Sequence, residues 1–206
     1  MKKGGLIISV VSVCAAILFS GCSSKATPKY TATFIDAKVS GVDYVCDGIK
    51  SKTDKDGKFT CPVGVKVDFS VGPLKLLTID PNKTKFRKNP QTGEVALFVK
   101  DAAPQVAAKI AAVLLTLDSD GDPDNGITLP KEADEIIKEV IPTPTSIDNI
   151  DVDDKVDDIA EKAEEKIGKD FEPKTIQDAT NHLNDVEQKV KEEFSQEVEG
   201  ITGGEG

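Results

Sequence analysis

The chain is poor in the residue types that build most catalytic sites. Its 206 residues contain no Trp, one His, one Met and two Tyr, and aromatic residues make up 5% of the composition. A single His leaves no imidazole cluster for a zinc site and argues against a Ser-His-Asp or Cys-His arrangement. No nucleophile elbow and no Gly-rich phosphate loop is present either. We therefore expect no catalytic residues, and we expect His182 to pack or to face solvent.

Basic residues are also in the minority. There are 36 acidic and 26 basic residues, which gives a formal net charge of −10. Nucleic acids and anionic membrane surfaces bind Lys- and Arg-rich surfaces, so this balance argues against both as partners. Residues 148–206 alone hold 19 acidic residues and 7 Lys, so the negative charge is concentrated there. The length allows one domain or two small ones.

The N-terminus has the pattern of a targeting segment. Lys2 and Lys3 precede an apolar run, residues 6–19, of about fourteen residues, which is too short to span a bilayer as a helix and is typical of a signal peptide. The run ends in Phe19-Ser20-Gly21-Cys22. This ending resembles the lipobox of bacterial lipoproteins, although Leu18 lies one position earlier than the usual Leu. The alternative is an ordinary secretory signal followed by a Cys that is there by chance.

The resemblance to lipoproteins implies that Cys22 becomes the N-terminus and carries palmitate-type acyl chains. Several chains anchor a protein stably where one does not. Ser23, rather than Asp, follows Cys22, and in lipoproteins this pattern implies transfer to the outer membrane. We therefore expect a signal peptide at 1–21, a tether at 22–29 and a protein bound to the bilayer through acylated Cys22.

Two cysteines remain after processing. Cys14 leaves with the signal peptide and Cys22 is acylated, so Cys46 and Cys61 are left. An oxidising envelope compartment favours a disulfide between them. The alternative is a pair of free buried thiols.

Residues 30–79 read as β-strands. The segment Val65–Val71 alternates apolar and polar residues, and Asp56-Gly57 is a strong turn dipeptide. The run Thr53-Asp54-Lys55-Asp56-Gly57-Lys58-Phe59 resembles the repeated motif of transthyretin-like β-sandwich modules, such as carboxypeptidase-regulatory-like domains. The resemblance implies a strand-turn-strand unit in which Asp54 and Asp56 are turn residues, and it implies little about activity.

Residues 80–142 combine a loop, a helix and an Asp-rich turn. A helix is expected over 101–117, with Asp101 as its N-cap. Four carboxylates and an amide follow at close spacing: Asp118, Asp120, Asp122, Asp124 and Asn125. Calcium prefers several oxygen ligands, so these residues form a candidate calcium site. Gly121 at the fourth position and Leu129 at the twelfth exclude an EF-hand. The alternative is an Asx-rich turn whose side chains bind backbone N–H groups.

The same stretch resembles a segment of the form LLxxLDxDGDxxNGI, found in a group of uncharacterised secreted and surface proteins of bacteria. In that group a later helix often has an Ala-x-x-His-Leu element, which Ala179–Leu183 matches. The resemblance runs from about Phe34 to Leu183. It implies an architecture and no settled activity.

Residues 148–199 are predicted to form acidic amphipathic helices. Apolar residues recur every three or four positions from Val152 to Ile167 and from Ile176 to Val198, Gly168 is a natural stop, and Thr175 with Asp178 forms a capping-box pattern. The apolar faces either pack on each other and on the 101–117 helix, or the last one docks a protein partner. A Pro-rich linker at 143–147 precedes these helices, and 200–206 is expected to be a flexible tail.

The sequence thus predicts an α+β fold, in which a small N-terminal antiparallel β-sandwich-like module precedes an α-helical C-terminal part. The favoured function is a non-enzymatic lipoprotein of the outer membrane or cell surface, with a calcium-ordered turn, in adhesion, matrix attachment or envelope assembly. The alternative is a periplasm-facing accessory lipoprotein, a pilotin or assembly factor, that binds a client through its C-terminal helix.

Overall fold

Two five-stranded sheets and a set of helices make up residues 27–201, the part of the chain that the computed structural model describes. The predicted signal peptide, Cys22 and residues 202–206 of the predicted tail lie outside these residues. The strands are β1 Lys29–Ile35, β2 Val39–Ser40, β3 Asp43–Cys46, β4 Ile49–Lys52, β5 Lys58–Pro62, β6 Val67–Val71, β7 Leu74–Ile79, β8 Lys85–Lys88, β9 Val95–Phe98, β10 Ile127–Thr128, β11 Thr145–Ser146 and β12 Gln196–Glu199. With the helices described below, this confirms the predicted α+β class.

Both sheets extend beyond the predicted module at 30–79. The strand order is β12-β8-β9-β1-β5 in one sheet and β11-β7-β6-β3-β4 in the other, while β10 and β2 form a separate parallel pair. The predicted loop at the start of 80–142 therefore contains β8 and β9, and the predicted linker at 143–147 contains β11, which pairs in parallel with β7. Without these strands β1 and β7 would have unpaired edges, so the N-terminal module is completed by the rest of the chain.

Aromatic side chains fill the space between the sheets. The ring centroid of Phe34 in β1 lies 4.9 Å from that of Phe69 in β6, and Phe59 in β5 meets Phe69 edge to face at 5.0 Å. All three side chains are buried. A disulfide between Cys46 and Cys61, whose Cα atoms are 6.0 Å apart, joins β3 of one sheet to β5 of the other.

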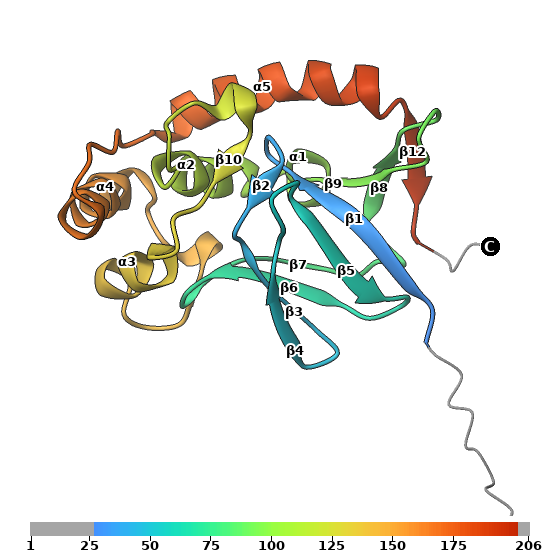
Figure 1. Cartoon of the computed structure of the whole chain (residues 1–206), viewed down its shortest axis with the longest axis horizontal. Helices are drawn as coiled ribbons and strands as arrows, with labels where there is room; N and C mark the ends of the chain where they lie inside the picture. The colour runs from blue at the N-terminus through green and yellow to red at the C-terminus, as the bar shows by residue number, and fades with distance from the viewer. Residues whose placement is uncertain (1–26, 202–206) are drawn as a thin grey trace, which may run out of the picture.

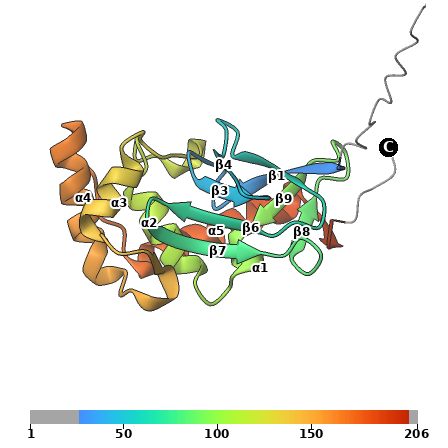
Figure 2. The same ribbon diagram turned by 90° about the horizontal axis from the view of Figure 1, so that it is seen from below.

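Helices cover one side and one end of the sheets (Figure 1). Helix α5 lies along the outside and packs mainly on α2, and α3 packs on α4. Figure 2 shows α3 and α4 at one end of the molecule and β8 at the other. The helices are α1 Val99–Ala102, α2 Ala107–Thr116, α3 Ala133–Val140, α4 Asp153–Ile167 and α5 Ile176–Glu193, with short 3₁₀ turns η1 Pro123–Asn125 and η2 Ile147–Asn149.

The predicted ends of the two acidic helices are partly right. Gly168 ends α4 in the left-handed conformation, and Thr175 and Asp178 form both hydrogen bonds of a capping box at the start of α5. The prediction that the last helix continues to Val198 is wrong. Helix α5 ends at Glu193, and β12 pairs with β8 in antiparallel register, which places Glu197 opposite Arg87 and Glu199 opposite Lys85. Pairing with a basic edge strand outweighs the helical periodicity here.

The prediction of a helix over 101–117 with Asp101 as its N-cap is also wrong. Asp101 lies inside the single turn of α1, and α2 begins only at Ala107. Pro104 separates the two, because proline lacks the N–H that a continuous helix would need. The Asp101 carboxylate instead accepts a hydrogen bond of 2.6 Å from Arg87 Nε.

The apolar face of α5 is covered by the rest of the fold. Leu183, Val186, Val190 and Phe194 are each no more than 5% exposed. The helices therefore pack on each other and on the sheets, as the first of the two sequence alternatives expects. The start of the predicted tail is held by a hydrogen bond, because the amide of Ile201 donates to the carbonyl of Pro81. No helix within residues 27–201 has the length and apolar character needed to cross a membrane.

We expect the Cys46–Cys61 disulfide to stabilise the pairing of the two sheets. The bridge closes a loop with a sequence separation of 15 residues, for which the loss of chain entropy in the unfolded state predicts about 3 kcal/mol of stability. Urea unfolding of a Cys46→Ala, Cys61→Ala double variant should show that decrease, and reductant should lower the stability of the wild-type chain alone. Alkylation of both cysteines in unreduced mature protein would contradict the bridge.

Candidate functional site

The Asp-rich turn between α2 and β10 is held by its own side chains. Asp118 Oδ1 accepts from the amide of Thr128 at 2.9 Å, Asp120 Oδ1 from the amide of Asp122 at 3.1 Å, and Asp122 Oδ1 from the amide of Asp124 at 3.2 Å. These are the bonds of an Asx-rich turn, the alternative that the sequence left open. They shape the loop from Asp118 to Gly126.

The five predicted calcium ligands do not all come together. Asp124 lies on the far side of the turn and pairs with Lys189 of α5 at 2.8 Å. Asn125 Nδ2 donates to Asp120 Oδ2 at 3.1 Å. Within residues 27–201, no three Asp, Glu, His or Cys side chains lie close enough together to hold a metal ion. A cation at this turn would therefore need backbone carbonyls or water to complete its ligands.

Asp118 is the unusual member of the turn. Its residue is 4% exposed, and its Oδ2 atom is buried without a hydrogen-bond donor among the described residues. Burial raises the pKa of Asp118, and the neighbouring carboxylate of Asp120 raises it further. The pKa of Asp120 itself is lowered, first by the amide of Asp122 and then by Asn125. An unsatisfied buried carboxylate oxygen beside a second carboxylate is a position that a cation would stabilise.

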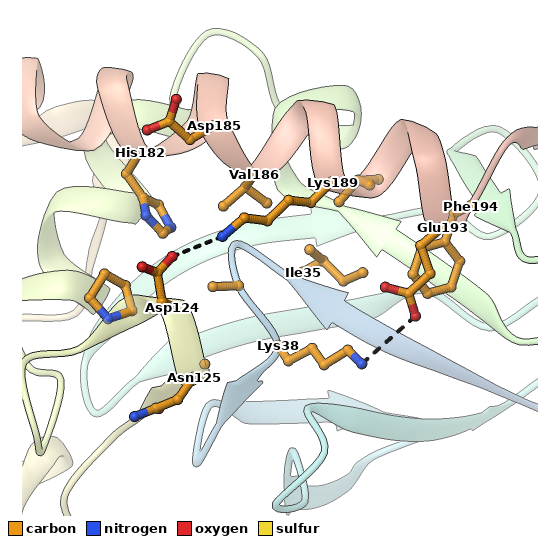
Figure 3. Close-up of a pocket in the computed structure, with 14 residues that line it drawn as sticks. Ile35, Lys38, Asp124, Asn125, His182, Asp185, Val186, Lys189, Glu193 and Phe194 are labelled. Atoms are coloured by element: carbon orange, nitrogen blue, oxygen red, sulfur yellow. Dashed lines mark hydrogen bonds and ion pairs between the residues drawn. The ribbon is translucent and has the colours of Figure 1, made fainter.

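The opposite face of the same turn borders a groove (Figure 3). One wall is α5, and the other is η1 together with the turn between β1 and β2. The groove has a volume of about 570 Å³, which lies within the range typical of small-molecule sites. Its lining is Ile35, Ala37, Lys38, Pro123, Asp124, Asn125, Gly126, His182, Asp185, Val186, Lys189, Val190, Glu193 and Phe194.

The β1–β2 turn reaches the groove in an uncommon backbone conformation. Lys38 has a φ of 48°, in the left-handed region that non-glycine residues rarely adopt. Two glycines pack against this turn: a β-carbon on Gly57 would lie 3.0 Å from the amide nitrogen of Val39, and one on Gly126 would lie 3.2 Å from the carbonyl oxygen of Lys38. The close packing fixes the turn and places the side chain of Lys38 in the groove wall.

His182 and Asp36 meet beneath the groove. The Nε2 atom of His182 lies 2.6 Å from the backbone carbonyl oxygen of Asp36, and because a carbonyl only accepts, Nε2 carries the hydrogen. Burial lowers the pKa of His182, which favours the neutral ring. The carboxyl group of Asp36 is fully buried, and neither of its oxygens has a hydrogen-bond partner among the described residues. Burial raises the pKa of Asp36 to about 8.

The sequence pointed to one side of this site and missed the other. It singled out the Asp-rich turn because four acids at alternate positions are conspicuous. It treated His182 as a packing or solvent-facing residue, and it did not select Asp36, Lys38 or Lys189. Nothing local marks these residues, since Asp36 and His182 are 146 positions apart in the chain. Comparison with protein-family models, with curated proteins and with solved structures finds no match.

We expect Asp36 to make the fold less stable as the pH rises. An unfolded Asp releases its proton near pH 4, whereas folded Asp36 keeps it until about pH 8. The folded state therefore binds the extra proton across this window, so stability is greatest below pH 4, falls between pH 4 and 8, and then levels off. A shift of this size corresponds to roughly 5 kcal/mol.

Asp36→Asn should remove most of this slope. Urea unfolding of the variant and of the wild type at pH 4.5, 6 and 8 measures the difference, and the exposed Asp157→Asn serves as the matched control. Parallel pH profiles for Asp36→Asn and the wild type would show that Asp36 is not protonated in the folded state.

Proposed function

We propose that this chain is a non-enzymatic lipoprotein of the bacterial outer membrane, anchored through acylated Cys22, with a role in adhesion, matrix attachment or envelope assembly. Support for the anchor comes from the Phe19-Ser20-Gly21-Cys22 pattern after a short apolar run. Support for a binding role, rather than a covalent catalytic one, comes from the groove beside α5. None of its described lining residues is Ser, Thr or Cys, so it offers no hydroxyl or thiol nucleophile.

We further propose that calcium binds to the Asp-rich turn of this protein and orders its junction with α2. The observation that carries this proposal is Asp118 Oδ2, which is buried without a donor next to Asp120. Asp118 ends the α2 segment, and its Oδ1 is bonded to β10 through the amide of Thr128. A dication held by Asp118, Asp120 and nearby carbonyl oxygens would therefore fix α2 relative to β10. Asn125 lies beside Asp120, to which its Nδ2 donates, while Asp124 is occupied by Lys189.

The accessory-lipoprotein alternative has less support. That hypothesis needs an apolar face of the C-terminal helix to hold a client. The apolar residues of α5 are instead buried against α2 and the sheets. A client would have to displace this packing, which involves several large side chains and therefore several kcal/mol.

The anchor proposal predicts the fate of a Cys22→Ser variant. Serine has no thiol to receive the diacylglyceryl group, so the variant should accumulate as an unlipidated precursor. Incorporation of labelled palmitate in cells measures this, and Cys14→Ser, which changes the apolar run of the signal, is the matched control and should label normally. Wild-type labelling of Cys22→Ser would mean that the acyl chains are attached elsewhere.

The calcium proposal predicts that the melting temperature rises with calcium. A ligand that binds only the folded state stabilises it by about 2.7 kcal/mol at a hundredfold excess over its dissociation constant. Calorimetry on mature protein, stripped with chelator and titrated with Ca²⁺, should show heat of binding and a rise in Tm. Asp120→Asn keeps a hydrogen-bond acceptor but loses the charge, so it should abolish the rise.

Asp124→Asn is the control within the same turn. Its side chain faces α5 rather than Asp118, so the variant should keep the response to calcium. Absence of heat and of a Tm shift in the wild type at physiological salt would leave a turn held by its own hydrogen bonds, and a response lost equally in both variants would move the site away from Asp118.

A further inference from the structure

Two ion pairs cross the groove from one wall to the other. Near its first end, Lys189 of α5 pairs with Asp124 of η1 at 2.8 Å, and near its second end Glu193 of α5 lies 3.9 Å from Lys38 of the β1–β2 turn. Figure 3 shows Ile35 and Val186 between the two pairs. In these two pairs each wall contributes one cation and one anion.

These ion pairs are easily exchanged for other partners. The side chains of Asp124 and Lys189 are 84% and 65% exposed, and those of Lys38 and Glu193 are about half exposed. Exposed pairs of this kind contribute about 0–1 kcal/mol each. A ligand that supplies its own charges at both ends loses little by opening them, and it gains contact with the partly exposed apolar residues Ala37 and Pro123.

The two ends differ in charge and in hydrogen-bonding character. The first end has Asp124 and Asp185 against a single Lys189, while the second has one Lys38 and one Glu193. His182 also lies at the first end, with its ring on the side of Asp124 (Figure 3). Because Nε2 donates to the carbonyl of Asp36, the other nitrogen, Nδ1, is the lone-pair acceptor of that tautomer. The first end thus has an excess of negative charge and an acceptor nitrogen, which suit a cationic N–H donor. At the second end Lys38 is the cation with which a carboxylate can pair when it displaces Glu193.

We propose that this groove binds short apolar peptides that have free termini, with the terminal ammonium group at Asp124 and His182 and the terminal carboxylate at Lys38. The ammonium group donates to Asp124 and to His182 Nδ1, both of which only accept in this arrangement. The apolar side chains lie on the partly exposed Ala37 and Pro123 and on the methylene stem of Lys189. The volume of the groove limits the ligand to a few residues. This inference goes beyond the lipoprotein and calcium proposals and does not depend on either.

The direct test is calorimetric titration of the mature chain with the tripeptide Ala-Leu-Ala, in chelator and in excess calcium. Three forms of the peptide are compared: both termini free, the amino terminus acetylated, and the carboxyl terminus amidated. Loss of a charge-assisted contact should weaken binding about tenfold for the acetylated form and severalfold for the amide. Calorimetry in both buffers separates this result from the calcium proposal, which concerns the other face of the turn.

Single-residue variants test which end of the groove binds which terminus of the peptide. Asp124→Asn should remove the preference for the free over the acetylated peptide, and Lys38→Gln should remove the preference for the free acid over the amide. Glu192→Gln, an exposed change on α5 outside the groove, is the matched control and should leave both preferences intact. Equal affinity for the free and acetylated peptides, or no heat with up to about 10 mM of the free peptide, overturns the proposal.

Discussion

The turn between β1 and β2 is the constraint on which the rest of the molecule depends. Three distant parts of the chain meet there: the Asp56-Gly57 turn, the end of the Asp-rich turn and helix α5. Gly57 and Gly126 favour this close backbone approach, because each has a positive φ and a β-carbon on either would fall 3.0–3.2 Å from backbone atoms of the turn. His182 then closes the arrangement with its bond to the carbonyl of Asp36. Packing from three sides is what holds Lys38 at a positive φ.

This convergence also explains why Asp36 is buried without a partner. The residue follows β1, whose side chains Phe34 and Ile35 are buried between the sheets and the helices. Once the β1–β2 turn is fixed by its neighbours, the carboxyl group is fully buried, and the imidazole nitrogen that lies 3.7 Å from its Oδ1 is already bonded to the backbone carbonyl. Folding therefore favours a protonated acid beneath the groove. Burial of a carboxyl group without a partner costs free energy, and the packing of the turn offsets this cost.

The features that the sequence predicted correctly are those that a few consecutive residues determine. The capping box at Thr175 and the stop at Gly168 each depend on three or four neighbouring positions. The Asx turns of the Asp-rich loop are equally local, although the sequence offered them only as the alternative to a calcium site. Asp54 is another example, since its carboxylate accepts from the amides of Asp56 and Lys58 as a turn residue should. Local hydrogen-bond chemistry decides all of these, so they hold whatever the tertiary context.

The features that the sequence could not give depend on long-range pairing. The residues after Phe194 continue a helical pattern, yet they form β12, which pairs in antiparallel register with β8 and brings Glu197 to 3.8 Å from Arg87. Asp101, the predicted N-cap, instead forms an ion pair with Arg87. On the groove side of the site, Asp36, Lys38 and Lys189 are ordinary turn and surface residues by pattern. Their role follows from strand order and helix placement, which no short window contains.

The Asp-rich turn has two faces, and its internal hydrogen bonds determine how strongly ligand binding at one face affects ligand binding at the other. Asp118 and Asp120 form one face, and Asp124 forms the other. Between them, Asp122 bonds the amide of Asp124, Asn125 bonds Asp120, and the β10–β2 pairing fixes the exit of the turn. These contacts hold the segment between the two faces, so a cation at Asp118 acts mainly on the junction of α2 with β10. Any coupling between the faces must be equal in both directions, and it can be only as large as the change that either ligand makes in the turn. With the turn ordered in advance, that change is small, so a cation at Asp118 and a ligand at Asp124 should bind nearly independently.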